Sequence, residues 1–276
     1  PPPPPPPHFQ AEDGIRDHLL GLVGSEMCIR DRVKGIYMLT LQRKILEAVS
    51  IGIFLAMVSG SASADMEVWR LDLSTESREV RPEAFSAWME SKGFKPFTYL
   101  FFKRRPEHWR IGPCKDAPQP CLTMQEKDSS SHIIHPLEPA LVVGDTLMVE
   151  LAYSVKVQAE GASLDQKDKE DAPLRIFLSF QTKDDLLHLA LTDSAAHAAG
   201  TVVKSEREPD TIRYYLLPDR SEAGGYQTGR FPVKTIFQKV YGPRDPGELV
   251  AIGIKSDSNN LGGESLTYLK TLRLIR

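Results

Sequence analysis

The sequence has little cysteine, no long apolar run and no excess of charge of one sign. Three of its 276 residues are cysteines, and the formal net charge is −3. A near-neutral chain without basic blocks lacks the electrostatic footprint of a nucleic-acid-binding protein. Three cysteines cannot supply a disulfide-dense scaffold or a four-cysteine zinc site. The composition therefore favours a globular domain that is stabilised mainly by its hydrophobic core.

Familiar catalytic signatures are also missing. The chain contains no GxSxG, HExxH, phosphate-binding loop or dinucleotide fingerprint. His132 and His135 are three residues apart, and in a strand they would point to opposite faces, so they are not expected to share a metal. His188, between two leucines, is interpreted as a strand-surface residue rather than a base. No catalytic residue is predicted, and the question whether the protein is an enzyme stays open.

The N-terminal segment reads unlike the rest of the chain. Seven prolines open it, and residues 10–31 show neither helical nor strand periodicity. The strings QAEDGIRD and LVGSEMCIRD, the second of which contains Cys28, resemble translated sequencing-adapter DNA. Residues 1–37 are therefore interpreted as a translation artefact and are excluded from fold reasoning. A Pro-rich disordered tail is the alternative.

Residues 38–64 have the pattern of a secretory signal peptide that starts at Met38. Arg43 and Lys44 are basic, residues 48–58 are apolar, and residues 62–64 (ASA) form a small-residue cleavage site. The apolar run is shorter than the roughly 20 residues of a membrane span. Cleavage would leave Asp65 first, in a periplasmic or secreted protein without a membrane span in the mature chain. An uncleaved anchor is the alternative.

The two remaining cysteines, Cys114 and Cys121, lie in the Pro-rich segment GPCKDAPQPC. An exported protein meets an oxidising compartment, so we expect them to form a disulfide. Closing so short a loop stabilises the fold by only about 2.5 kcal/mol in the chain-entropy account. The expected role is to pin a surface loop, and two free thiols are the alternative.

Strand periodicity dominates residues 65–276, which are expected to form a single domain. Residues 146–158 alternate apolar and polar side chains, as a half-buried strand does. Helices are expected over Pro82–Lys92 and Val233–Tyr241. Many strands, few helices and no βαβ alternation predict a mainly β protein, an antiparallel β-sandwich of jelly-roll type. Further strands are expected at residues 68–73, 97–102, 131–137, 174–180, 186–191, 211–217, 250–255 and 266–275.

Two polar loops, residues 159–171 and 256–264, adjoin predicted strands. Glu170 and Asp171 precede one strand, and Asp257 follows another. If these strands are antiparallel neighbours, the two loops must meet. Crowded carboxylates repel unless a cation, an arginine or bound hydroxyls compensate them. The sequence thus predicts a shared ligand-binding site of Glu170, Asp171, Arg175, Asp257, Asn259, Asn260 and Glu264.

Calcium is the candidate cofactor of this shared site, and engagement of Arg175 or Lys255 or binding of a polar ligand are the alternatives. The run that starts at Asp257 begins like a calcium-binding loop, but Leu261 and Tyr268 stand where liganding oxygens are needed. The other interpretation is a turn whose Asn and Gly residues accept left-handed backbone angles.

Exposed Trp and Tyr side chains are a second binding resource, because their rings stack on the apolar face of a sugar. Most aromatic residues are nevertheless expected in the core. The candidates are Trp69, Trp88, Trp109, Tyr226 and Tyr241.

Long stretches of the chain resemble the domain of unknown function (DUF) 3047 family of exported bacterial proteins. The similarity starts near Trp88 with KPFTYLFF and CLTMQEKDSSSHIIHPLEP, and is strongest in LMVELAYSVKVQAEGASLDQKDKEDAPLRIFLSF and LVAIGIKSDSNNLGGESLTYLKTLRLI. It covers most of residues 65–276. The resemblance implies a sandwich similar to carbohydrate-binding modules and no established activity. Members usually carry Asp-Thr-Asp-Asn where this chain has Asp257-Ser258-Asn259-Asn260, so the shared site is less acidic here.

These observations favour an exported, non-catalytic binding module of the cell envelope, for a glycan or other polar ligand. The first alternative is a hydrolase of envelope polymers that uses Asp171, Asp257 and Glu264. It requires two carboxyl groups about 5 to 9.5 Å apart across a cleft, one with a raised pKa. The second is a periplasmic structural or assembly protein, which a large exposed apolar patch would favour.

Overall fold

The structure, a computed structural model, describes residues 65–73, 76, 79–99, 102–104, 106–114, 117–218 and 225–276. The adapter-like segment and the expected signal peptide, residues 1–64, lie outside the described residues. The chain divides into two compact units, one of Pro1–Ser63 and Thr98–Lys103, the other of Ala64–Phe97 and Arg104–Arg276. The second unit contains the sandwich.

The described residues form fourteen strands, two α-helices and one short 3-10 helix. The strands are β1 (Glu67–Arg70), β2 (Lys95–Tyr99), β3 (Phe102–Arg104), β4 (Arg110–Cys114), β5 (Ala117–Lys127), β6 (Ser130–Val142), β7 (Met148–Val157), β8 (Arg175–Gln181), β9 (Leu186–Thr192), β10 (Val202–Lys204), β11 (Ile212–Leu216), β12 (Gln227–Pro232), β13 (Glu248–Asp257) and β14 (Glu264–Ile275). The helices are α2 (Pro82–Ser91), α3 (Val233–Tyr241) and the 3-10 helix η1 (Lys167–Lys169).

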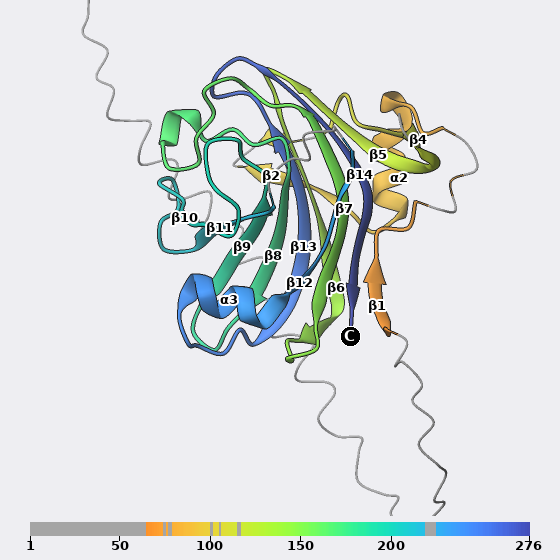
Figure 1. The fold of residues 1–276 in the computed structure, drawn as a ribbon. Helices are drawn as coiled ribbons and strands as arrows, with labels where there is room; N and C mark the ends of the chain where they lie inside the picture. The colour runs from red at the N-terminus through yellow and green to blue at the C-terminus, as the bar shows by residue number, and fades with distance from the viewer. Residues whose placement is uncertain are drawn as a thin grey trace, which may run out of the picture. The chain divides into compact units, whose positions relative to one another are not determined.

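Two sheets form the sandwich (Figure 1). The first sheet has the order β12-β7-β14-β5-β4, with β1 also paired to β14, and the second runs β10-β11-β9-β8-β13-β6-β2. Between β4 and β14, the chain crosses from one sheet to the other after β5, β6, β7, β11, β12 and β13. Such repeated crossing is the topology of a jelly roll. The mainly β jelly-roll sandwich predicted from the sequence is confirmed.

One strand pair departs from the predicted antiparallel pattern. β9 and β11 run parallel, with His188 opposite Ile212 and Thr192 opposite Leu216. A parallel pair needs a long connection that returns the chain to its starting end. Residues 193–211, which include β10, supply that connection. The sequence pattern did not reveal it, because alternation is the same in both kinds of ladder.

The core between the sheets follows from this alternation. In β8, Ile176, Leu178 and Phe180 are buried inward, whereas the residues between them face outward. Helix α2 buries Phe85, Trp88 and Met89, and α3 buries Val233, Ile236 and Phe237. Both predicted helices are confirmed, with α2 ending one residue earlier than expected. Neither helix of the described chain is long and apolar enough to span a membrane.

The two ends of the described region lie side by side. Met66 and Arg276 exchange both backbone hydrogen bonds, each with N···O at 2.9 Å. The Asp65 carboxylate lies 2.7 Å from the guanidinium of Arg230 on β12. Strand β1 continues the contact by pairing with β14 (Figure 1). The sandwich therefore begins and ends at one point on the first sheet.

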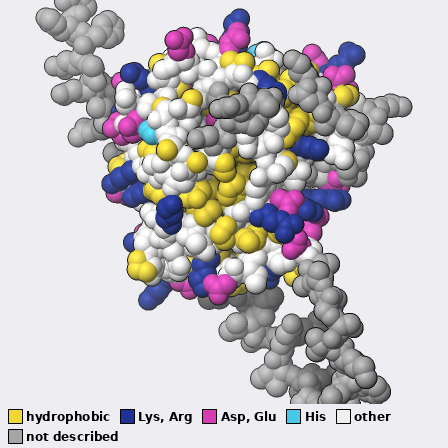
Figure 2. All heavy atoms as spheres, viewed as in Figure 1, with side chains coloured by type: hydrophobic (Ala, Val, Ile, Leu, Met, Phe, Trp, Pro, Cys, Tyr) yellow, Lys and Arg dark blue, Asp and Glu magenta, His cyan; other side chains and the backbone are white. Residues whose placement is uncertain are grey.

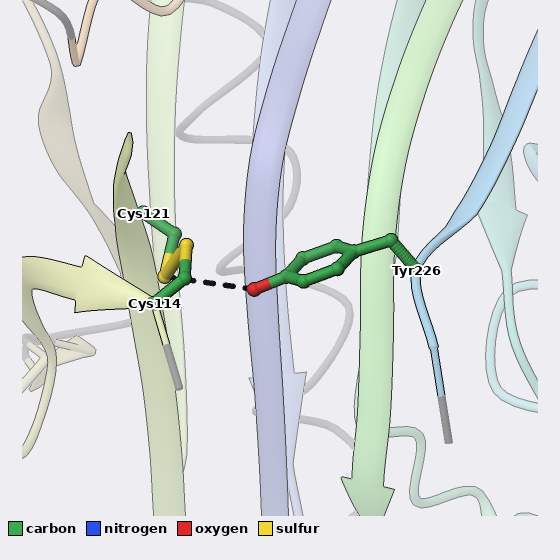
Figure 3. The surroundings of a disulfide bond; sticks show 3 residues. All are labelled: Cys114, Cys121 and Tyr226. Carbon is green, nitrogen blue, oxygen red and sulfur yellow. Dashed lines mark hydrogen bonds between the residues drawn. A yellow bond between two sulfur atoms is a disulfide. The ribbon is translucent and has the colours of Figure 1, made fainter. Parts of the chain in front are cut away.

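The expected disulfide between Cys114 and Cys121 is present (Figure 3). The prediction that it pins a loop is wrong, because Cys114 ends β4 and Cys121 belongs to β5, so the bond joins two paired strands. The hydroxyl of Tyr226 lies 4.0 Å from Cys121 Sγ. Tyr268 packs beside both cysteines. The disulfide thus belongs to a small cluster on the outer face of the first sheet.

Charged side chains of both signs are mixed over the surface seen in Figure 2, and hydrophobic side chains show at its centre. Large hydrophobic residues that are clearly exposed in the described chain are Met66, Val142 and Val157. They belong to three different strands or segments. Scattered exposure of this kind is normal for a folded domain.

Candidate functional site

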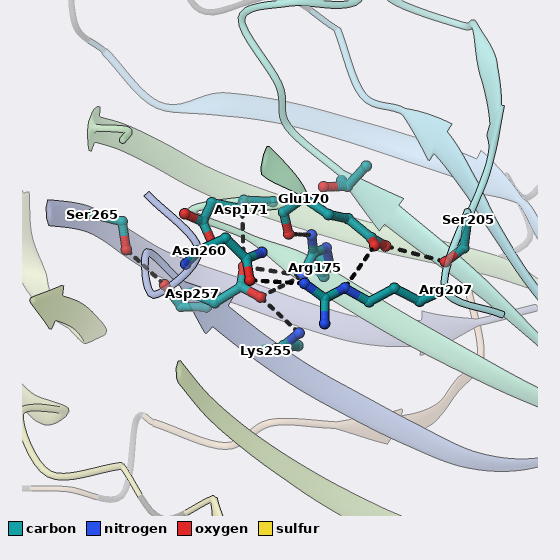
Figure 4. A network of polar contacts seen from close by, with 12 residues as sticks. Glu170, Asp171, Arg175, Ser205, Arg207, Lys255, Asp257, Asn260 and Ser265 are labelled. Atoms are coloured by element: carbon teal, nitrogen blue, oxygen red, sulfur yellow. Dashed lines mark hydrogen bonds and ion pairs between the residues drawn. The ribbon is translucent and has the colours of Figure 1, made fainter. Parts of the chain in front are cut away.

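The two acidic loops meet, as the sequence suggested. β8 and β13 are antiparallel neighbours, with Arg175 opposite Lys255. The Ala172 N–H donates to Asp257 Oδ1 at 2.8 Å. In the other direction, the Asn260 and Leu261 N–H groups donate to the Asp171 carboxylate at 3.1 and 3.0 Å. We call this set, with Glu170, Arg175 and Lys255, the anchor cluster (Figure 4).

Asp257 is the centre of the anchor cluster. Nη1 of Arg175 lies 2.9 Å from Oδ1 and 2.7 Å from Oδ2 of Asp257, and Nζ of Lys255 lies 2.7 Å from Oδ2. Arg175 is 1% exposed and Asp257 2%. Burial raises the pKa of Asp257, but the charges of Arg175 and Lys255 outweigh burial and bring the pKa to about 2. Asp257 is therefore a fixed anion near neutral pH.

Glu170 joins the cluster from the loop before β8. Its backbone oxygen accepts from Nη2 of Arg175 at 2.5 Å. Its carboxylate accepts from the Tyr214 hydroxyl and from Ser205 Oγ, the latter at 3.2 Å. Arg207 Nε approaches the same carboxylate at 3.3 Å. Burial raises the pKa of Tyr214 well above its usual value, so its hydroxyl stays protonated and donates.

Arg207 also ties the two loops to each other. Its Nη2 donates to the Lys167 carbonyl oxygen at 2.8 Å and to Asn260 Oδ1 at 2.9 Å. Asn259 lies half-buried in the same turn. Glu264, by contrast, is exposed and pairs with Lys127 of β5 at 3.3 Å. Four of the predicted carboxylate and amide residues thus share contacts, and Glu264 has its partner elsewhere.

The anchor cluster does not fit calcium. Among the described residues, no group of three or more His, Cys, Asp or Glu is arranged to hold a metal. The oxygens of Asp257 face two cations, and those of Asp171 accept backbone N–H groups. Calcium takes six to eight oxygen ligands, and these carboxylates already face cations and N–H donors. Gly262 has a φ of 64°, which agrees with the turn interpretation of this segment.

A second feature lies on the outer face of the second sheet, where three rings stack across the strands. The His132 ring centroid is 4.7 Å from that of Phe97 and 5.1 Å from that of Phe177, with interplanar angles of 27° and 30°. These rings come from β2, β6 and β8, and β13 runs between the last two. A Cβ at Gly253 of β13 would lie 3.0 Å from His132 Nε2 and 3.2 Å from Phe177 Cβ. Glycine at this position therefore lets the two rings lean together.

Polar groups surround the stack. Lys255 lies opposite His132 in the ladder and its side chain is 25% exposed. Ser179 Oγ and His188 Nδ1 are 3.0 Å apart. Burial lowers the pKa of His188 to about 4 and that of His132 well below its usual value, so both imidazoles are neutral at pH 7. We call this surface the ring face, made of the outward residues Lys95, Phe97, His132, Ile134, Arg175, Phe177, Ser179, His188, Ala190, Ala251, Gly253, Lys255 and Asp257.

The loop of residues 159–174, called the flanking loop, closes one end of the ring face. Leu164 and Ala172 pack on Phe177 and Tyr214. His197 fixes the loop further, because its Nε2 accepts from the Leu164 N–H at 3.1 Å. The anchor cluster lies where this loop meets the sheet (Figure 4). The predicted acidic residues thus hold a wall in place beside the rings.

The aromatic residues proposed from the sequence lie elsewhere. Trp109 is fully buried and Trp88 is 8% exposed. Trp69 packs on the core, and the Tyr241 hydroxyl donates to backbone oxygens of β9 and of the segment before β11. Tyr226 lies by the disulfide. The sequence did not predict Phe97 and Phe177 as site residues, although a glycine inside the apolar strand β13 is a signal of close packing above it.

The chain belongs to the family described as protein of unknown function (DUF3047), which it matches over residues 95–273. This range is more than half of the chain. No protein of curated function matches the sequence.

Solved structures that are similar in fold include carbohydrate-binding modules and glycosidases. A family 28 module specific for non-crystalline cellulose shares 10% identity at a TM-score of 0.35, covering 76% of this chain and 97% of its own. A family 11 module from Clostridium thermocellum, in complex with a β-1,3-1,4-mixed-linked tetrasaccharide, shares 12% identity at a TM-score of 0.33. The match covers 78% of this chain and 97% of the module. A family 12 xyloglucanase from Bacillus licheniformis shares 8% identity at a TM-score of 0.36. The match covers 66% of this chain and 99% of the xyloglucanase. Values this low carry no conclusion about this chain.

Proposed function

We propose that the protein is an exported, non-catalytic binding module of the cell envelope that takes a glycan or another polar ligand on the ring face. The observation that carries the proposal is the combination of half-buried rings and hydrogen-bonding groups on one outward sheet face. Phe97 and His132 are half-buried, Lys255 lies opposite His132, and Ser179 and His188 face the same side of the sheet on β8 and β9. Ligand sites typically join apolar rings to a few placed polar groups in this way.

The flanking loop supports the same proposal. Its residues Leu164 and Ala172 pack on this face. On the part of the face between β2 and β8, Lys95 is exposed, and Phe97, His132 and Lys255 are half-buried. A sheet face with one fixed wall suits an extended ligand that lies across the strands. Because the wall is fastened by buried ion pairs, the site would be largely preformed before binding.

Binding would be tested with the purified protein on a panel of envelope polysaccharides and oligosaccharides. Replacing Phe97 by Ala removes one ring from the stack, and we expect affinity to fall by about fivefold or more. Lys127→Gln, on the outer face of the first sheet, is the matched control and should bind like the wild type. If no glycan binds, or if Phe97→Ala binds unchanged, the proposal fails.

The hydrolase alternative receives less support from the carboxylates. Asp257 has a lowered pKa and two cationic partners, and Glu264 pairs with Lys127 instead. Burial raises the pKa of Asp171, but backbone N–H groups already occupy both of its oxygens. A general acid must be free to give its proton to the substrate. Prolonged incubation of bound glycan should release no new reducing ends, and their appearance would favour the hydrolase.

Export is part of the proposal. If the signal is cleaved after Ala64, the mature chain begins at Asp65, whose carboxylate contacts Arg230. Expression from Met38 followed by fractionation and intact-mass analysis would test this. The expected product lies outside the cytoplasm and lacks residues 38–64, whereas a cytoplasmic, full-length product would contradict the proposal.

A further inference from the structure

Charge is unevenly distributed on the ring face. On the strands near the rings, Arg175, Lys255 and Lys95 stand against one carboxylate, Asp257, and the flanking loop adds Glu170 and Asp171, with Arg207 beside Glu170. The other outward carboxylate of β13, Glu248, lies at the opposite end of the strand. The strands therefore carry two more cations than carboxylates near the rings, and the flanking loop offsets one of these charges.

Lys255 differs from Arg175 in how far its donors are used. Arg175 is 1% exposed and directs its two terminal nitrogens to Asp257 and to the Glu170 backbone oxygen. The ammonium of Lys255 contacts one oxygen of Asp257 at 2.7 Å, and its side chain is 25% exposed. An ammonium has three donors. Lys255 therefore keeps donors that can reach a ligand beside the rings of His132 and Phe177.

Asp257 holds the Lys255 ammonium in position and is also paired with Arg175. The pair formed by Asp257 and Arg175 is already balanced, since each supplies one unit charge at 2.7 Å. Lys255 is then a second cation that the same carboxylate holds in position. In the flanking loop beside Lys255, the Glu170 carboxylate pairs with Arg207. The Asp171 carboxylate accepts hydrogen bonds from backbone N–H groups of the 257–263 turn.

We infer that the ring face takes an acidic sugar, with the carboxylate of a uronic acid residue placed at Lys255 and the sugar ring lying against the half-buried rings of Phe97 and His132. This inference rests on the proposed glycan-binding function and adds its substrate class. A charge-assisted hydrogen bond is about twice as strong as a neutral one, so the carboxylate would separate acidic from neutral glycans. The neutral His132 and His188 add no charge that would change with pH near 7.

The test compares ligands that differ only in charge. Galacturonate and glucuronate oligosaccharides, their methyl esters and neutral gluco-oligosaccharides are presented to the purified protein, and affinities are measured by titration calorimetry. The acids should bind about tenfold more tightly than their esters. Because Lys255 is partly exposed, this preference should shrink as salt rises from about 20 mM to about 500 mM.

Lys255→Gln provides the decisive variant, because Arg175 and the Ala172 N–H still hold Asp257 in it. It should bind acids and esters alike, whereas Lys127→Gln, which removes an exposed charge from the other sheet, should keep the preference. Equal binding of acids and esters by the wild type, or a preference that survives in Lys255→Gln, overturns the acidic-sugar inference and leaves glycan binding intact. Failure of every acid, ester and neutral glycan to bind overturns both.

Discussion

At the scale of single residues, the anchor cluster shows how buried charge acts in this fold. Asp257 and Arg175 are both almost completely buried and face each other at 2.7 Å. Removing two charges from water costs several kcal/mol for each, which the pair and its hydrogen bonds must offset. Such a pair therefore contributes little net stability while it is whole and costs much when it is broken.

Replacing Asp257 by Ala should accordingly be severe. The change leaves Arg175 and Lys255 as uncompensated charges, and we expect the free energy of unfolding to fall by about 3–5 kcal/mol. Urea denaturation followed by circular dichroism measures this. Glu264→Ala breaks an exposed pair with Lys127 and should stay within about 0.5 kcal/mol of the wild type. A loss below about 1 kcal/mol for Asp257→Ala would contradict the assigned burial of the pair.

The same carboxylate predicts a pH dependence. The pKa of Asp257 in the fold is lowered to about 2 from an ordinary value of 3.8. Its ionised form therefore stabilises the fold fully above the ordinary value, and this contribution is lost as the pH falls through the folded value. The difference in unfolding free energy between the wild type and Asp257→Asn should be constant above about pH 5 and shrink toward pH 2. A difference that grows on acidification would contradict the lowered pKa.

Gly253 is the other residue on which the site depends. A methyl group there would press on His132 Nε2 at 3.0 Å and on Phe177 Cβ at 3.2 Å. We expect Gly253→Ala to lower the free energy of unfolding by about 1–3 kcal/mol through overpacking. Gly144→Ala, where nothing lies within 4 Å of the new methyl, is the matched control and should be neutral or slightly stabilising. Equal thermal melting temperatures for the two variants would show that the rings of His132 and Phe177 can move aside to accommodate the methyl group.

At the scale of elements, the sequence predicted the helices and strands that have a clear local pattern of apolar and polar residues. The second helix was placed over Val233–Tyr241, as the structure has it, because its apolar residues recur at helical spacing. Strand β7 was predicted from its alternation. Strands β4 and β5 were missed because Pro113 and Pro120 read as loop, yet these residues pair with each other at the edge of the first sheet, where proline is tolerated. The edge strands β10 and β12 were missed because they are short or polar.

The site was predictable to a similar extent. Meeting of the acidic loops followed from one assumption about strand order, which the pairing of β8 with β13 satisfies. The ring stack needs the order of four strands, because Phe97, His132 and Phe177 belong to separate strands with Gly253 on a fourth. Long-range order of this kind leaves no periodic trace in the sequence.

The flanking loop offers a test at the element scale. Arg207 contacts the Lys167 carbonyl, the Glu170 carboxylate and Asn260. Arg207→Ala should therefore speed amide hydrogen exchange about tenfold in residues 163–171 and 257–263 while the sheets exchange as before. Arg244→Ala, which removes an exposed arginine paired with Asp185, is the control. Unchanged exchange in both loops would mean that the buried pairs alone hold the wall.

At the scale of the whole molecule, the pairing of Met66 with Arg276 makes the described fold almost a closed ring of chain. The same strand packing could then form from a chain that starts at a different strand. A short glycine linker from Arg276 to Asp65, with new ends opened between the exposed residues Lys183 and Asp184 of the β8–β9 turn, gives a circular permutant. Exposed turns between paired strands tolerate such opening. The permutant should show the same β-sheet circular dichroism and the same cysteine pairing, and a permutant that fails to fold would mean that the present starting point is needed to guide assembly.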